Sequence, residues 1–105
     1  MDVVITDVTA SGKETARAIL TGVSSNITLA EVIRLRVRDE VARHNAIGTG
    51  LLDWEHQADS AVKSFKRNGF FVFVGDRQIT DLDAELSLSE ADVVSFFRLV
   101  PLAGG

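Results

Sequence analysis

Residues 28–41 read TLAEVIRLRVRDEV and carry the clearest structural signal in the chain. Thr28 can accept a hydrogen bond from the first helical turn, while Glu31, three residues later, can reach back to the Thr28 backbone; this is a capping box. Apolar side chains then recur at helical spacing and form one stripe, made of Leu29, Val32, Ile33, Val37 and Val41. We therefore predict an amphipathic helix that starts at Thr28 and ends near Asn45.

A β-hairpin is expected before this helix. Residues 3–8 are mostly β-branched, and a second stretch of strand character covers about residues 15–23. Between them lies a turn-forming cluster that contains Gly12. Which face of the hairpin is buried stays open, because side chains simply alternate along a strand.

Further strands are expected in the second half of the chain. Residues 93–100 carry large apolar side chains at both alternating sets of positions, so this strand lies in the middle of a sheet or has one face against a partner. A polar connection over residues 81–92 precedes it. The other expected strands are residues 70–74, a buried one, and residues 77–80, a short one.

A second helix is expected between Asp53 and Asn68. Its apolar residues follow helical spacing, and Asn68-Gly69 is a C-terminal stop. Two arrangements are open: the helix packs against the exposed sheet face or Leu35, or it leaves that face free for a partner. The element order predicts an α+β domain with a mixed sheet. In it the first helix buries Leu29, Ile33, Val37 and Val41 against Phe71, Phe73 and one face of residues 93–100.

Composition excludes several classes of protein. A chain of 105 residues fits one domain, and its longest apolar run, residues 70–74, is far shorter than the roughly 20 residues of a membrane span. The absence of cysteine excludes disulfides and thiolate chemistry. A net charge of −4 argues against nucleic acid as the main ligand. With no basic leader segment, we expect a cytoplasmic protein that binds other proteins and neither membranes nor nucleic acid.

No motif indicates an enzyme active site. Ser11-Gly12-Lys13 lacks the second glycine of a phosphate-binding loop and is better explained as a hairpin turn. His44 and His56 are two isolated histidines and specify no metal site, so surface positions are favoured. The serines lack the surroundings of a catalytic nucleophile. We expect neither a catalytic residue nor a bound metal.

The end of the chain is different. After the last expected strand, residues 100–105 read VPLAGG, and Pro101 cannot continue a strand ladder. Because two glycines carry no side chains, the backbone of these last residues could enter a narrow crevice of another protein. The alternative is a frayed terminus of small residues.

This ending resembles that of the ubiquitin-like β-grasp carriers. The residues that carry the resemblance are Gly75-Asp76, the segment LSLSEADVVSF at residues 86–96, and PLAGG at residues 101–105. They are similar to the ending of the small subunit of molybdopterin synthase. The thiazole-pathway sulfur carrier and the ubiquitin-related modifier share the diglycine end. The match covers about the last third of the chain, whereas the earlier residues agree only in the order of elements.

The resemblance implies a β-grasp domain over residues 1–100, followed by a flexible diglycine tail, residues 101–105. In that family a separate activating enzyme uses ATP and magnesium to adenylate the terminal carboxylate, and the carrier itself binds no cofactor. The acyl adenylate becomes a thiocarboxylate that donates sulfur to a biosynthetic enzyme, or it leads to an isopeptide bond with a lysine of a target protein. A third reading is a binding module that is never activated.

The expected site residues follow from this resemblance and from the apolar last strand. Gly104 and Gly105 form the acyl-carrying terminus. The residues expected to contact the activating enzyme are Phe96, Phe97, Arg98, Pro101, Leu102 and Ala103.

Overall fold

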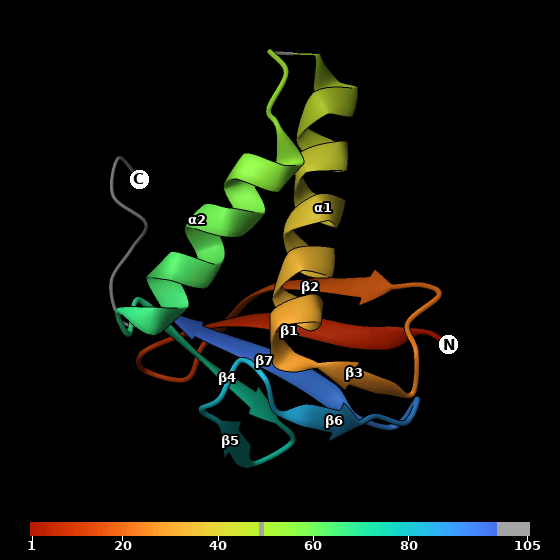
Figure 1. Ribbon diagram of the computed structural model, residues 1–105, viewed down its shortest axis with the longest axis vertical. Helices are drawn as coiled ribbons and strands as arrows, with labels where there is room; N and C mark the ends of the chain where they lie inside the picture. The colour runs from red at the N-terminus through yellow and green to blue at the C-terminus, as the bar shows by residue number, and fades with distance from the viewer. Residues whose placement is uncertain (49, 99–105) are drawn as a thin grey trace.

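The computed structural model describes residues 1–48 and 50–98. Within them the chain forms two helices and seven strands (Figure 1). In chain order they are β1 (Val3–Thr9), β2 (Glu14–Leu20), β3 (Asn26–Thr28), α1 (Leu29–Ile47), α2 (Trp54–Lys66), β4 (Phe70–Val74), β5 (Arg77–Ile79), β6 (Glu85–Ser87) and β7 (Val93–Arg98). The α+β prediction, with an inserted second helix, is confirmed.

Helix α1 begins with the expected capping box. The backbone N–H of Glu31 donates to Thr28 Oγ1 at 3.2 Å, and the Thr28 N–H donates to Glu31 Oε1 at 3.5 Å. The helix continues past Asn45 to Ile47, and Gly48 ends it in the left-handed conformation, with φ of 84°. Instead of ending the helix, the Asn45 side chain accepts from the Leu52 N–H at 2.9 Å and so holds the following loop.

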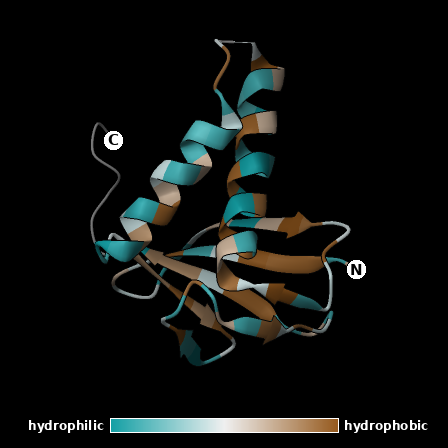
Figure 2. Cartoon of the chain, in the orientation of Figure 1, coloured by the Kyte–Doolittle hydropathy of each residue, from teal (hydrophilic) through white to brown (hydrophobic). Residues whose placement is uncertain are grey.

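The main sheet has the strand order β2-β1-β7-β4-β5. The β1–β7 pair is parallel and the other pairs are antiparallel, so the sheet is mixed. Strand β7 therefore occupies the centre, which is one of the two arrangements that its apolar residues on both faces left open. Figure 2 shows that hydrophobic residues follow the strands of the sheet and the side of α1 that meets them.

A second, two-stranded sheet joins β3 to β6. Its strand β6 lies within residues 81–92, which the sequence predicted to be a polar connection. Ile27 and Leu86 are opposite each other in this pair and are both buried, so the small sheet closes one end of the core. The sequence signal for β6 was the alternation of Leu86 and Leu88 with serines. This alternating stretch is shorter than a typical strand pattern.

The core lies between α1 and one face of the main sheet. Val72 and Phe96 are opposite each other in the β4–β7 pair, and both are buried. Because side chains alternate, Phe71 and Phe73 lie on the other face of the sheet. The expectation that these two phenylalanines pack under α1 is wrong. The fully buried contacts of the core are made by Val3, Ile5, Leu29, Val32, Ile33, Leu86, Val72 and Val94.

Helix α2 packs against α1 on the same side of the sheet (Figure 1). Asp53 caps its start by accepting from the Glu55 N–H at 3.0 Å. Phe65 joins the core, where its ring centroid lies 5.6 Å from that of Phe70. The alternative in which this helix covers the opposite face of the sheet is therefore excluded.

One residue of α1 departs from the expected burial. Val37 is only half-buried, although the stripe predicted it in the core. It lines a groove between α1 and α2 instead. Trp54 lies near the guanidinium groups of Arg34 and Arg38, 5.8 and 5.3 Å from the ring centroid.

Replacing Ile33 by Ala should lower the free energy of unfolding by about 2–5 kcal/mol, because the substitution leaves a cavity at the centre of the core. Ile33 is 1% exposed. The matched control is Ile47→Ala at a residue that is 77% exposed, where a change within about 0.5 kcal/mol is expected. Urea denaturation followed by Trp54 fluorescence measures both. Equal effects of the two substitutions would contradict the packing of α1 described above.

Candidate protein-docking site

One face of the main sheet is turned away from both helices, and we call it the open face (Figure 1). No helix in residues 1–48 or 50–98 packs on it. Its residues alternate along each strand with those that meet α1. They are Arg17 and Ile19 of β2, Val4, Thr6 and Val8 of β1, Val93, Ser95 and Phe97 of β7, Phe71 and Phe73 of β4, and Gln78 of β5.

The strand register arranges the open face in three rows. Val8, Phe97 and Phe71 form one apolar row across three neighbouring strands. In the middle row Thr6 Oγ1 donates to Ser95 Oγ at 2.9 Å, and Phe73 follows on β4. The third row is apolar again and contains Ile19, Val4 and Val93.

Apart from Val8, which is 8% exposed, the apolar residues of this face are only partly covered. Ile19 is 54% exposed, and the phenylalanines of β4 and β7 on this face are half-buried. The Phe73 and Phe97 rings pack together with centroids 4.9 Å apart. Contiguous apolar surface that reaches water is typical of a protein-docking site, and packed aromatic side chains are typical of its centre.

The structure separates the residues that were expected to bind an activating enzyme. Phe97 lies on the open face, whereas Phe96 is 3% exposed and forms part of the core under α1. Arg98 alternates to the helix side and lines a groove between the two helices. Pro101, Leu102, Ala103, Gly104 and Gly105 lie outside the described residues.

An ion pair that sequence reasoning missed joins α1 to the sheet. Arg36 Nη2 donates to Asp7 Oδ2 at 2.6 Å and also pairs with Glu40. The Arg36 guanidinium lies 4.7 Å from the centroid of the Phe96 ring. The available signal was its place at the edge of the apolar stripe, which turns it towards the sheet.

The remaining polar candidates include no metal-binding cluster in the described part of the chain. Ser11-Gly12-Lys13 is part of a hairpin turn, as predicted, in which the Gly12 N–H donates to the Thr9 carbonyl. His44 and His56 are exposed residues of different helices. No group of three His, Cys, Asp or Glu residues among residues 1–48 and 50–98 could hold a metal ion.

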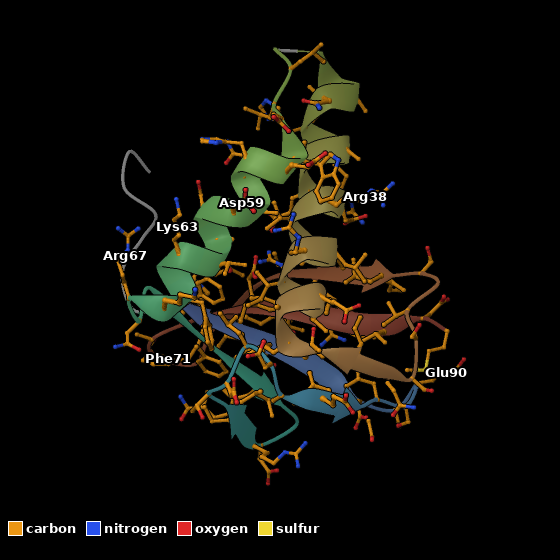
Figure 3. All side chains as sticks on the ribbon, in the orientation of Figure 1. Arg38, Asp59, Lys63, Arg67, Phe71 and Glu90 are labelled. Carbon is orange, nitrogen blue, oxygen red and sulfur yellow. The ribbon has the colours of Figure 1, made fainter. Side chains whose placement is uncertain are left out.

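An exposed ion pair joins α1 to α2. Arg34 donates to Asp59 at 2.8 Å, and this hydrogen bond holds the pKa of the Asp59 carboxyl below its usual value. Arg38 of α1 and Asp59 of α2 are both exposed residues (Figure 3). Exposed ion pairs of this kind contribute little to stability, so we interpret the outer surface of the two helices as a solvent-facing one. Neither helix of the described residues is long and apolar enough to span a membrane.

Comparison of the chain with protein-family models, with curated proteins and with solved structures gave no match. Function is therefore inferred from the chain's own residues. They define an α+β domain with both helices on one side of a mixed sheet. The sheet has an apolar open face on its other side, and its central strand leads into the diglycine segment.

Replacing Arg36 by Met should lower the free energy of unfolding by about 3–5 kcal/mol, because the mostly buried Asp7 carboxylate loses its counter-charge. Asp7 Oδ1 already has no hydrogen-bond partner among the described residues. In an Asp7→Asn background the same substitution should cost much less, since no buried charge remains. Urea denaturation of the two single variants and the double variant gives this coupling, and additive effects would exclude it.

Proposed function

We propose that this protein is a ubiquitin-like carrier with a β-grasp fold, activated at Gly105 and used as a thiocarboxylate sulfur donor. The observation that carries the proposal is the position of β7. This strand is the centre of the sheet and ends at Arg98, next to the open face, and seven residues ending in Gly-Gly follow it. The element order supports the β-grasp assignment: a hairpin, a capped helix, and a last strand parallel to the first.

The chemistry needs little from the carrier itself. A carboxylate is a poor acyl donor, so an oxygen of the Gly105 carboxylate attacks the α-phosphorus of ATP and pyrophosphate leaves. A sulfur nucleophile of the activating system then attacks the carbonyl carbon of the adenylate, and AMP leaves. Gly105 has no Cβ to hinder this attack. The enzyme supplies ATP, magnesium and every thiol, since this chain has no cysteine.

The open face would be the docking site for the activating enzyme. Its row Val8, Phe97 and Phe71 lies at the end of the sheet where β7 finishes. An enzyme bound there would be close to the start of the terminal segment. Seven residues can extend about 23 Å, which is enough to reach an active site beyond the contact surface.

A protein modifier is the second candidate. It shares the adenylation step, but Gly105 ends in an isopeptide bond with a lysine of a target protein. Helix α2 favours this reading, because it makes the domain larger than the compact bacterial sulfur carriers and closer in size to the ubiquitin-related modifier. A binding module that uses only the open face would need neither reaction.

Deleting Gly105, or adding one residue after it, should abolish ATP–pyrophosphate exchange with the cognate activating enzyme. The reason is that the attacking carboxylate is removed or displaced, while the core in residues 1–98 is untouched. The intact mass of the natural protein first establishes that it ends at Gly105. An unchanged urea midpoint is the folding control. Exchange that persists in both variants rejects Gly105 as the acyl donor.

Mass spectrometry after incubation with ATP, the enzyme and a sulfur source separates the candidates. Replacement of one terminal oxygen by sulfur adds about 16 Da and marks sulfur carriage by an activated acyl group. A Gly-Gly remnant on a lysine of another protein after digestion marks modification instead. If neither product nor pyrophosphate exchange appears with any candidate enzyme, the binding module replaces both.

Docking on the open face predicts that Ile19→Asp and Phe73→Asp weaken binding to the activating enzyme by at least about tenfold, because a charge is placed in an apolar contact. Ile47→Asp is the matched control: it changes the same residue type at another exposed position, on α1. Calorimetry measures binding, and circular dichroism checks the fold. Similar losses for Ile19→Asp and Ile47→Asp would remove the open face from the proposal.

A further inference from the structure

Strand β2 forms one edge of the main sheet, and no strand of residues 1–48 or 50–98 pairs with its outer side (Figure 1). It has seven residues, whereas β5, at the other edge, has three. Five of the seven residues of β2 are exposed. In an antiparallel pair, alternate backbone N–H and C=O groups point away from the neighbouring strand. The outer side of β2 therefore presents a row of backbone groups that a further extended segment can bind.

The edge of β2 carries little protection against such pairing. Natural edge strands are often blocked by proline, by lysine or by a bulge. Strand β2 contains neither proline nor lysine. Its irregularity lies opposite Asp7 and Val8, at the start of the strand. From Ala16 to Leu20 the pairing with β1 is regular, so this stretch can extend the sheet.

A groove with a volume of about 360 Å³ borders the same edge on the helix side of the sheet, and we call it the β2 groove. Ala16 and Ala18 line it from β2, and their short side chains leave space above the strand. Arg36, Glu40 and Arg43 line it from α1. Because side chains alternate along a strand, an extended segment paired with β2 would place every second side chain in this groove.

The β2 groove contains more cationic than anionic residues. Its charged lining residues are Arg17, Arg36, Arg43, Arg98, Asp7 and Glu40. Both carboxylates pair with Arg36. The other three arginines therefore form a local cationic site in a protein whose net charge is −4.

These cations are accessible to a ligand. The Arg43 side chain is 61% exposed and pairs with Asp39, and Arg17 is also exposed and pairs with Glu14. Exposed ion pairs are weak, so a carboxylate of a ligand can compete for these arginines at little cost. Arg98 also borders two neighbouring hollows, so Arg17 and Arg43 are the cations that distinguish the β2 groove.

We propose that the edge of β2 and the β2 groove together bind an extended acidic segment of another protein by strand addition. Backbone groups of residues 16–20 hydrogen-bond the segment, and its carboxylates, at alternate positions, face the groove. The apolar residues between those carboxylates lie beside Ile19, which is 54% exposed on the open face. A second copy fits less well, because pairing two β2 strands would bring two cationic grooves together. This binding does not depend on the proposed carrier function.

A synthetic peptide as long as β2, with alternating glutamate and valine and both ends blocked, is the probe. Titration into the isotope-enriched full-length protein, followed by NMR, measures the dissociation constant. A peptide of alternating lysine and valine is the control for strand propensity. The glutamate peptide should bind at least about tenfold more tightly, because its charge is complementary to the groove. Its binding should weaken as salt is raised. Equal binding of the two peptides rejects the proposal.

Arg43→Glu should weaken binding of the glutamate peptide at least about fivefold, because one attraction is lost and one repulsion is gained. Arg38→Glu is the matched control: it makes the same charge change at an exposed position of α1 that does not line the β2 groove. Its affinity should stay within about twofold, because salt screens a charge outside the site. Circular dichroism checks the fold of both variants. Similar losses of affinity would indicate unspecific attraction and overturn the proposal.

Hydrogen exchange tests the strand addition itself. With the glutamate peptide bound, alternate amides of residues 16–20 should exchange more slowly, because they donate to the added strand. Amides of β5, at the other edge, should not change. Protection at β5 instead, or binding without protection of β2, rejects the proposal. If the free protein already protects these β2 amides and sediments as a dimer, a second copy occupies the edge and the proposal fails.

Discussion

The contact between the apolar stripe of α1 and one face of the sheet is the constraint on which the rest of the structure depends. Leu29, Val32 and Ile33 are almost completely buried, and so are Val72 and Val94 of the strands they face. Because a side chain on a strand can point to only one face, this contact assigns every second residue of β1, β4 and β7 to the core. The other residues of the same strands are left on the open face.

The position of α2 follows from the length of α1. Helix α1 extends beyond the sheet, where no strand can bury the end of its stripe. Helix α2 packs against it there and adds Phe65 to the core, next to Phe70. The cover is incomplete, and the groove that contains Val37 remains. The same insertion that enlarges the domain thus creates a second apolar surface beside the end of β7.

The two surfaces lie on opposite sides of the sheet, and the central strand connects them. Phe97 belongs to the open face, while the next residue, Arg98, lines the groove.

The sequence by itself determined the features that depend on neighbouring residues. The capping box of α1, the turn at Gly12, both helices and the diglycine end can all be recognised within short stretches. Tertiary structure decided the rest. Alternation along β4 and β7 is the same whichever face is buried, so only packing against α1 placed Val72 and Phe96 inside and Phe73 and Phe97 outside. The β3–β6 pair and the Asp7–Arg36 ion pair join residues distant in sequence, and no local pattern specifies such partners.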